Sequence, residues 1–321
     1  MIIFAYNLKL LFIIFILTTV KFGAIDIGSN GARLLICSVL QENIDQVKFK
    51  DVEYTRFPLR LGTDVFSEQK IGKKKIEQLL KLIKAFKLLL ELHEVEDFMT
   101  VATSAFREAK NGKEVIQKVK TETGIEIEII EGSREAEILD AVITKQLTSF
   151  QNYLHIDVGG GSTELNLYFG TQKIASKSFP MGSIRNVGSR ENIEILKNIR
   201  VWIEENIKKI QTKLPITAIG TGGNINKIAS LLRSKNQLIQ HSQIREILFE
   251  LNKMSFYHKV NTLQLNPDRA DTICPAAYIY LSVMEWVGAT EMEVPELGMT
   301  DGMMELMWRK YQQKPLRKKN I

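Results

Sequence analysis

The chain has 321 residues, of which 45% are hydrophobic and 25% are charged. This composition is that of an ordinary globular protein and excludes a disordered or fibrous chain, and the length allows two domains. The net charge of +6 favours anionic partners in general without choosing among them. Only two cysteines occur, Cys37 and Cys274, which excludes a disulfide framework and a zinc site and indicates a reducing, cytoplasmic compartment.

Residues 10–20 form an almost wholly apolar segment that follows Lys9. The segment is too short to cross a bilayer, which takes about 20 residues, and no small-x-small cleavage site follows it. We therefore interpret residues 1–20 as an apolar N-terminal extension in which residues 1–19 come from a start codon assigned too early, with translation beginning at the codon of Val20. The alternative is a membrane anchor in residues 10–20. On the first interpretation we expect no stable membrane association.

From residue 21 onward, the chain shows alternating strand and helix patterns. Apolar runs on either side of the first glycine turn predict strands, and apolar residues recur at helical spacing between residues 72 and 92. In chain order the first half is predicted to contain strands at 22–27, 33–40 and 47–55, a helix at 72–92, a strand at 98–102, a helix at 112–123, a strand at 125–130 and a helix at 133–145.

The second half repeats this order of patterns. It is predicted to contain strands at 153–158, 164–169 and 173–179, a helix at 191–213, a strand at 216–219, a helix that reaches residue 232, and helices at 271–287 and 300–311. Strand hairpins followed by alternating strands and helices, twice over, predict two α/β domains with a cleft between them. We expect domain I at residues 21–140 and domain II at residues 141–321.

Two nearly identical turns carry the strongest functional signal, IDIGSNG at residues 25–31 and IDVGGGS at residues 156–162. Glycines at the end of a strand allow a sharp turn and expose backbone N–H groups that can bind phosphate oxygens. A third glycine loop, GTGG at residues 220–223, joins a predicted strand to a helix N-terminus, a typical position for anion binding. The three loops predict a phosphate chain held between the two halves.

Acidic residues lie close to these loops in the sequence, namely Asp26, Glu135, Asp157 and Glu164. A carboxylate beside bound phosphate is unfavourable unless a cation such as Mg²⁺ lies between them, or unless the carboxylate acts as a base toward water. For a single Asp-x-Gly turn the simpler interpretation is an aspartate bonded to its own backbone. The presence of the same turn in both halves favours a site.

Five segments resemble one known family in sequence, order and spacing. They are AIDIGSN at 24–30, ATSAFR at 102–107, EGSREA at 131–136, IDVGGGSTEL at 156–165 and GTGG at 220–223. The family is that of the exopolyphosphatases and guanosine pentaphosphate phosphatases, and the resemblance covers residues 22–309. It implies an α/β fold of duplicated actin-like ATPase (ribonuclease H-like) domains with an interdomain cleft, in which the final helix, at about 300–311, packs back on domain I.

The resemblance also implies roles for individual residues. Glu135 matches a general base that deprotonates the attacking water, Arg107 matches a guanidinium that neutralises phosphoryl oxygens, and Asp157 and Glu164 match carboxylates of Mg²⁺ binding and catalysis. Asp26 is expected as a further metal ligand, because it lies beside the first glycine turn. The expected phosphate-binding residues are Gly28, Ser29, Asn30, Gly160, Gly161, Ser162, Gly222 and Gly223.

Arg269 and Asp271 match a further element of the family, at the start of the helix predicted over residues 271–287. Two interpretations stay open for them. They either belong to the site or form a helix cap, in which the aspartate complements the helix dipole.

The expected activity is Mg²⁺-dependent hydrolysis of the terminal phosphate of inorganic polyphosphate, with guanosine pentaphosphate as a further substrate. Two other classes of protein remain as alternatives: an actin-like kinase or ATPase, and a non-catalytic sensor of polyphosphate or guanosine tetraphosphate. No nucleic acid partner is expected. The sequence does not fix the oligomeric state, for which a homodimer is one possibility.

Overall fold

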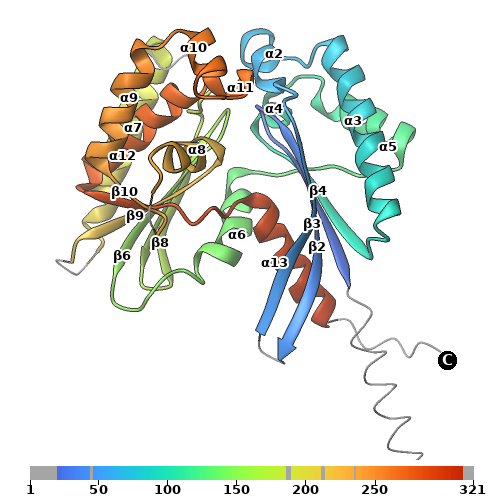
Figure 1. Cartoon of the computed structure of the whole chain (residues 1–321), viewed down its shortest axis with the longest axis horizontal. Helices are drawn as coiled ribbons and strands as arrows, with labels where there is room; N and C mark the ends of the chain where they lie inside the picture. Colours follow the sequence, from blue (N-terminus) through green and yellow to red (C-terminus); the bar gives the residue numbers. More distant parts are fainter. Residues whose placement is uncertain (1–19, 44–45, 186–188, 211–213, 235, 314–321) are drawn as a thin grey trace, which may run out of the picture.

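A computed structural model describes residues 20–43, 46–185, 189–210, 214–234 and 236–313 (Figure 1). The N-terminal extension interpreted above, residues 1–20, therefore lies outside the described part except for its last residue. Within the described part, no helix combines the length and the apolar character that crossing a membrane requires.

The first half is built on a sheet with the strand order β3-β2-β1-β4-β5. β1, β2 and β3 pair in antiparallel fashion, whereas β4 is parallel to β1 and β5 is parallel to β4. The strands are β1 (Lys21–Ile27), β2 (Ala32–Asn43), β3 (Gln46–Phe57), β4 (Asp97–Ala102) and β5 (Glu128–Ile129). β5 is shorter than the strand predicted at 125–130, because only these two residues pair with β4 at the sheet edge.

The second half repeats this topology in a sheet with the order β10-β11-β9-β6-β7-β8. β6, β7 and β8 are again antiparallel, and β9 and β11 continue in parallel from β6. The strands are β6 (Asn152–Val158), β7 (Thr163–Phe169), β8 (Gln172–Phe179), β9 (Ile216–Thr221), β10 (Leu238–Gln240) and β11 (Glu291–Glu293). The matching orders confirm the predicted duplicated, actin-like α/β fold.

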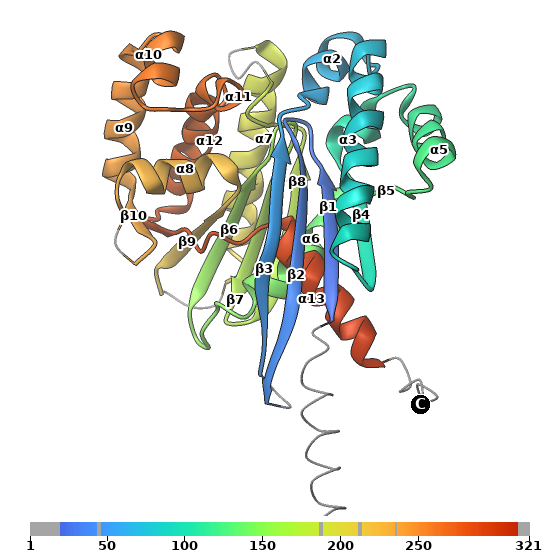
Figure 2. The same cartoon turned by 45° about the vertical axis from the view of Figure 1, so that its right-hand side comes forward.

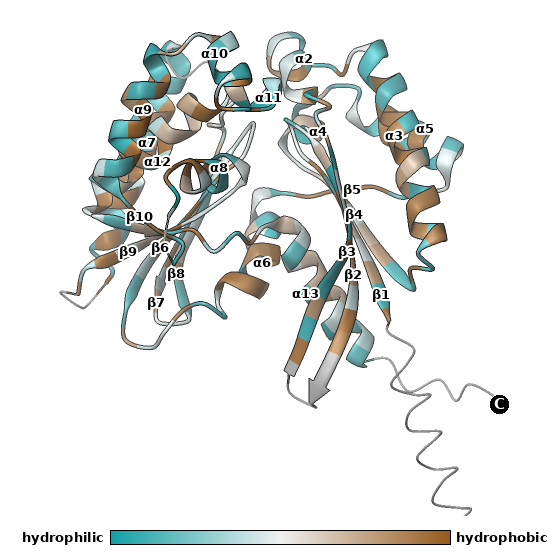
Figure 3. Ribbon diagram, viewed as in Figure 1, coloured by the Kyte–Doolittle hydropathy of each residue, from teal (hydrophilic) through white to brown (hydrophobic). Residues whose placement is uncertain are grey.

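The helices of the first half are α2 (Leu61–Glu68), α3 (Lys73–Leu92), α4 (Ser104–Glu108), α5 (Gly112–Thr123) and α6 (Gly132–Ile143). α3 carries the predicted apolar face, since Leu79, Ile83 and Phe86 are buried in the same core cluster as β1. Hydrophilic and hydrophobic residues both occur along α3, as expected of a helix with one face on the core (Figure 3). α2 and α4 were not predicted.

The helices of the second half are α7 (Arg190–Ile207), α8 (Gly223–Leu231), α9 (His241–Lys253), α10 (Phe256–Asn261), α11 (Pro267–Ala270), α12 (Ile273–Val287) and α13 (Met299–Gln313). The N-cap residue of α7 is Ser189, whose side chain accepts a hydrogen bond from the Asn192 amide. It ends before the predicted residue 213, and residues 211–213 lie outside the described part. α9, α10 and α11 lie between residues 241 and 270, where the sequence analysis assigned no individual element.

α6 and α13 pack against each other between the two sheets (Figures 1 and 2). A Cβ atom on Gly302 of α13 would lie 2.1 Å from the Ile138 carbonyl of α6, so the two helices can approach this closely only at a glycine. α13 buries Met303 and Met307 in one cluster with Phe22 of β1. The expected boundary between residues 140 and 141 falls inside α6, and the division into domains stays an expectation.

Candidate active site

The glycine turns of the two halves have the same internal geometry. In the β1–β2 turn the Gly28 amide donates to the Gly31 carbonyl over 3.0 Å, and in the β6–β7 turn the Gly159 amide donates to the Ser162 carbonyl over 3.0 Å. These two amides close their own turns. The tip of each turn is formed by the residues between the donor and the acceptor of its hydrogen bond, Ser29 and Asn30 in the first turn and Gly160 and Gly161 in the second.

The tips of the two turns lie against each other. A Cβ atom on Gly160 would lie 3.1 Å from the Asn30 amide nitrogen, and one on Gly161 would lie 3.0 Å from Ser29 Oγ. Ser29 also shares a hydrogen bond of 2.8 Å with Ser104 at the start of α4. The structure therefore brings together the phosphate-binding residues predicted in the two turns, and glycine in the second turn is what allows the contact.

The third glycine loop joins β9 to α8 beside the second turn. Gly222 has a φ of 110°, which residues with side chains rarely adopt, and a Cβ there would lie 3.1 Å from Asp157 Oδ1. Gly223 begins α8, and its carbonyl accepts a hydrogen bond from the Arg269 guanidinium. Both predicted glycines thus adjoin polar groups of the site, Gly222 an acid and Gly223 an arginine.

Asp26 and Asp157 occupy equivalent strand ends with different neighbours. Asp26 faces Arg33 across the β1–β2 pair, and Asp157 faces Glu164 across the β6–β7 pair. Asp26 forms an ion pair of 2.5 Å with Arg33. The negative charge of Asp26 is therefore balanced, whereas Asp157 has a second acid as its neighbour.

Asp157 and Glu164 form an acid pair in which burial opposes ionisation. Glu164 is 2% exposed and accepts a hydrogen bond of 2.8 Å from Ser178 Oγ. Burial, and then the charges of Glu135 and Asp157, raise the pKa of Glu164 well above its ordinary value. Burial also raises the pKa of Asp157, although Thr221 Oγ1, 2.8 Å from Asp157 Oδ1, donates a hydrogen bond that acts in the opposite direction.

Glu135 lies in the first turn of α6 and is 5% exposed. Arg107, in the last turn of α4, donates to Glu135 Oε1 and, over 2.6 Å, to the Ile130 carbonyl. Burial raises the pKa of Glu135 to about 7, with Arg107 acting against this shift and the charges of Asp157 and Asp26 adding to it. A carboxyl group with a pKa near neutrality is suited to accept a proton from water at neutral pH.

Asp157 and Glu164 have the chemistry of a divalent cation site. Their oxygen ligands are of the kind that Mg²⁺ prefers. A cation beside them would offset both the burial and the repulsion between acids that raise the pKa values of Asp157, Glu164 and Glu135. Among the described residues, no group of three or more His, Cys, Asp or Glu side chains is arranged to hold a metal ion. Asp26 is bonded to Arg33, so the residues fit a cation on the two acids of the second half better than on the predicted set of three.

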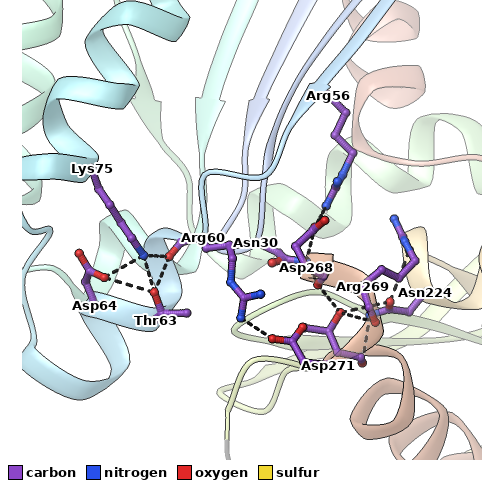
Figure 4. A network of polar contacts seen from close by, with 11 residues as sticks. Asn30, Arg56, Arg60, Thr63, Asp64, Lys75, Asn224, Asp268, Arg269 and Asp271 are labelled. Atoms are coloured by element: carbon purple, nitrogen blue, oxygen red, sulfur yellow. Dashed lines mark hydrogen bonds and ion pairs between the residues drawn. The ribbon is translucent and has the colours of Figure 1, made fainter. Parts of the chain in front are cut away.

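Asp268, which the sequence analysis missed, joins the two halves beside the first turn (Figure 4). It is 4% exposed and accepts hydrogen bonds from Asn30 Nδ2 over 3.2 Å and from the Arg56 guanidinium. Nearby, Arg60 forms an ion pair of 2.6 Å with Asp271. Asp271 thus pairs across the halves instead of capping α12, whose N-cap residue is Thr272.

Arg269 and Arg185 are two further cations at this junction. Burial, and then the nearby guanidinium groups of Arg56 and Arg33, lower the pKa of Arg269 to about 10. Arg185, in the loop after β8, donates over 2.6 Å to the Gly161 carbonyl and forms an ion pair of 2.5 Å with Glu108 of α4. Arg269 was noticed in the sequence as part of a motif, but no local pattern marks Arg185.

A sequence model described as the Ppx/GppA phosphatase family matches residues 40–310 of the chain. The chain belongs to the Ppx/GppA phosphatase family. Phosphatases of this family generally depend on a divalent metal ion, which agrees with the chemistry of Asp157 and Glu164.

Two curated relatives illustrate the range of proteins that this family member resembles. It is 29% identical over 301 residues to the bifunctional 3-dehydroquinate synthase/phosphatase of Fusobacterium nucleatum, a match that covers 85% of this chain and 44% of the relative. It is 22% identical over 307 residues to exopolyphosphatase 1 of Mycobacterium tuberculosis, covering 88% of this chain and 87% of the relative. This chain therefore spans less than half of the first protein and most of the second.

Solved structures share the fold of this family member. A Ppx/GppA protein of Aquifex aeolicus is 23% identical and superposes with a TM-score of 0.70, covering 91% of this chain and 98% of its own. An exopolyphosphatase of Cytophaga hutchinsonii is 21% identical, with a TM-score of 0.76 and coverage of 90% and 98%. Because both sequence identities are below 25%, these structures show that the fold is shared and no more.

Proposed function

We propose that this Ppx/GppA family member is an exopolyphosphatase, which hydrolyses the terminal phosphoanhydride bond of inorganic polyphosphate and releases orthophosphate. We include guanosine pentaphosphate as a further substrate and Mg²⁺ as the divalent ion. The relatives named as exopolyphosphatases support this substrate class. The observation that carries the proposal is Glu135, a buried carboxyl group with a pKa of about 7 beside the acid pair.

Glu135 acts as the general base in the proposed reaction. Its carboxylate takes a proton from a water molecule as the water attacks the terminal phosphorus, so the protonated Glu135 and the released phosphate are the immediate products of the step. Arg107 holds Glu135 in place by the hydrogen bond to Oε1. The bond between the phosphorus and the bridging oxygen breaks, and the shortened chain leaves with that oxygen.

The two turn tips hold the phosphate chain in this proposal. The amides of Gly28 and Gly159 close their own turns, so we assign the phosphate contacts to the amides and hydroxyl groups between them, at Ser29, Asn30, Gly160, Gly161 and Ser162. Backbone N–H groups at fixed positions stabilise charge on phosphoryl oxygens without reorganisation. Gly222 and Gly223 complete this surface at the start of α8.

Asp157 and Glu164 would hold the Mg²⁺ ion. When bound, the ion supplies positive charge that offsets the phosphate charge and lowers the barrier to attack by an anionic nucleophile. Asp26, which is paired with Arg33, orients Arg33 toward the second half, where the Arg33 charge lowers the pKa of Asp157.

Phosphate release from polyphosphate of defined length tests this function. With the purified chain and Mg²⁺ we expect orthophosphate to accumulate as the chain shortens from its end, and a chelator should abolish the release. Guanosine pentaphosphate and ATP are assayed in parallel. Hydrolysis of ATP without release from polyphosphate would instead identify an ATPase, and binding of polyphosphate without any release would identify a sensor.

A further inference from the structure

A row of polar side chains crosses the buried face of the second sheet behind Asp157. His155 of β6 faces Asn166 of β7, and Asn166 faces Ser176 of β8. Thr221 of β9, which faces Asp157, lies beside His155. We call His155, Asn166, Ser176 and Thr221 the polar row. The His155–Asn166 pair and the Asp157–Glu164 pair are two residues apart along β6 and β7, so they lie on the same face of the sheet.

The polar row runs from Ser176, which is exposed on β8, to three residues inside the protein, and its members are bonded to one another. His155, Asn166 and Thr221 have 0% exposure. His155 Nε2 lies 2.8 Å from Thr221 Oγ1, Asn166 Nδ2 lies 3.2 Å from His155 Nδ1, and Ser176 Oγ lies 2.6 Å from Asn166 Oδ1. An unpaired polar group costs free energy when it is buried. The hydrogen bonds among these side chains offset that cost for the polar row.

The equivalent row in the first half is apolar. At the register positions of His155, Asn166 and Thr221, the first sheet has Ala24, Leu35 and Val101, which are buried in one hydrophobic cluster. The fold therefore does not require polar residues at these positions. A role in the chemistry of the second half explains them better than packing does.

The hydrogen bonds of the polar row run in one consistent direction. Ser176 donates to Asn166 Oδ1, so the amide nitrogen of Asn166 faces His155 Nδ1, which must accept. The imidazole proton then lies on Nε2, which donates to Thr221 Oγ1. Because the Thr221 oxygen accepts from His155, its own proton is free for Asp157 Oδ1, to which it donates over 2.8 Å.

We propose that His155 is a positioning residue for the acid pair: its neutral ring, protonated at Nε2, fixes the Thr221 hydroxyl as a donor and thereby fixes the Asp157 carboxylate. The role in catalysis rests on the proposed function. The hydrogen-bond direction itself does not, because it is a property of the protein without substrate. Outer groups that orient a ligating carboxylate are typical of metal sites.

The tautomer of His155 gives the first test. The chain has four histidines, His93, His155, His241 and His258, so nitrogen-15 labelling of histidine and long-range correlation spectra can resolve them, with His155→Asn to assign the signal. We expect Nε2 of His155 to be protonated and Nδ1 to be unprotonated, and Thr221→Val to shift the Nε2–H signal. A proton on Nδ1 would overturn the proposal, because Thr221 would then donate to His155 and not to Asp157.

Turnover of polyphosphate gives the second test, in a set of matched variants. His155→Asn and Thr221→Val each remove the donor chain to Asp157, and we expect a loss of about 10–100-fold in turnover or in apparent Mg²⁺ affinity. His155→Gln should retain most of the activity, because its amide nitrogen can replace Nε2. Thr123→Val, which removes a buried hydroxyl bonded only within α5 and its C-terminal end, controls for the loss of a buried hydrogen bond and should leave turnover unchanged.

Combining the variants separates positioning from simple destabilisation. If His155 acts through Thr221, the double variant His155→Asn/Thr221→Val should be no slower than Thr221→Val alone. Additive losses, or equal losses in His155→Gln and His155→Asn, would overturn the proposal. If the wild-type chain releases no phosphate from polyphosphate, the proposed function fails, and the tautomer still decides the proposal about His155.

Discussion

The two halves of the molecule share a sheet order and a glycine turn, but they differ at the residues that flank the turn. On either side of the first turn, Asp26 faces Arg33, and the two form an ion pair. On either side of the second turn, Asp157 faces Glu164, and burial raises the pKa of both acids. The first half therefore carries a neutralised ion pair, and the second half carries two acids whose ionisation is opposed by burial.

This difference indicates how a duplicated fold can divide its work. Both turns keep the geometry that exposes backbone amides, so both halves can contact phosphate. Only in the second half does the aspartate before the turn face another acid instead of an arginine, and two such acids can bind a cation together. Glu135 has no equivalent in the repeat, and it lies in α6, which packs between the sheets. The comparison therefore supports the proposal that the metal binds in the second half and that the base lies between the halves.

The largest expected effect follows from removing the base. Glu135→Gln should lower turnover by about 10²–10⁴-fold and leave the KM for polyphosphate nearly unchanged, because the residue acts on the water molecule and not on substrate binding. Glu137→Gln is the matched control, since Glu137 lies on the same helix, is exposed and forms an ion pair with Arg134 one turn away. Equal turnover in Glu135→Gln and the wild type would remove Glu135 from the mechanism.

The next effect compares the two halves directly at equivalent positions. Glu164→Gln should lower turnover by about 10²-fold, the scale on which one charged group acts in a catalytic site, and should preserve or raise the unfolding free energy. Arg33→Gln should lower turnover much less. It should lower the unfolding free energy by about 1–3 kcal/mol, between the values for exposed and buried pairs, because Arg33 is 30% exposed and Asp26 only 4%.

Phosphate release and urea unfolding of both variants separate these outcomes. If the two halves differ as described, Glu164→Gln should mainly lower turnover, and Arg33→Gln should mainly lower the unfolding free energy. If both variants lose turnover equally, or if Glu164→Gln is the less stable of the two, then the halves do not divide their work in this way.

Burial of these acids should also appear in the pH dependence of stability. Glu135 has a pKa of about 7 when folded, against an ordinary value of 4.5, so between these pH values the folded protein binds more protons than the unfolded chain. The unfolding free energy then falls as the pH rises through this window, by up to about 3 kcal/mol from this group. Below pH 4.5 Glu135 is protonated in both the folded and the unfolded state, so the unfolding free energy no longer changes with pH through this group.

Urea unfolding at several pH values, with a chelator present, measures this contribution. In Glu135→Gln the fall between pH 4.5 and 7 should be smaller than in the wild type. Arg107 loses its charged partner in the variant, which shifts the absolute stability at every pH, so the pH dependence is the readout. Glu164, whose pKa is also raised, leaves a residual slope of the same sign.

The parts of the fold that were predictable are those with a long local signal. The helical face of α3 and the strands around both turns follow from apolar spacing and glycine positions. α2 was missed because it is short and because its N-cap residue, Arg60, has a φ of 53° and makes no side-chain hydrogen bond to the helix. β11 was missed because it is a three-residue strand defined by its pairing with β9 and β10.

The site divides in the same way. The acids near the glycine turns were predictable because each lies beside a turn with a recognisable sequence. The Arg56–Asp268 contact was not, because its partners are 212 residues apart and only the packing of the halves brings them together. The polar row was also missed, because it depends on strand register, and single polar residues such as His155 and Asn166 look unremarkable in the sequence.

The smallest expected effect concerns the glycines of the second turn. In the first turn the tip carries the side chains of Ser29 and Asn30, and in the second it carries Gly160 and Gly161. A Cβ atom on Gly161 would lie 2.4 Å from Phe66 Cζ, whereas one on Gly159 would have only a contact of 3.3 Å with the Ser162 carbonyl.

Gly161→Ala should therefore lower the unfolding free energy by about 1–3 kcal/mol, the usual effect of overpacking, and Gly159→Ala by less. Urea unfolding of the two variants gives the difference. The strain in Gly161→Ala comes from Phe66 of α2 in the first half, so Phe66→Leu, which shortens the opposing side chain, should recover part of the loss in the double variant. Equal losses in both alanine variants, without recovery by Phe66→Leu, would mean that the second turn does not press against α2 and that the asymmetry of the turns has another cause.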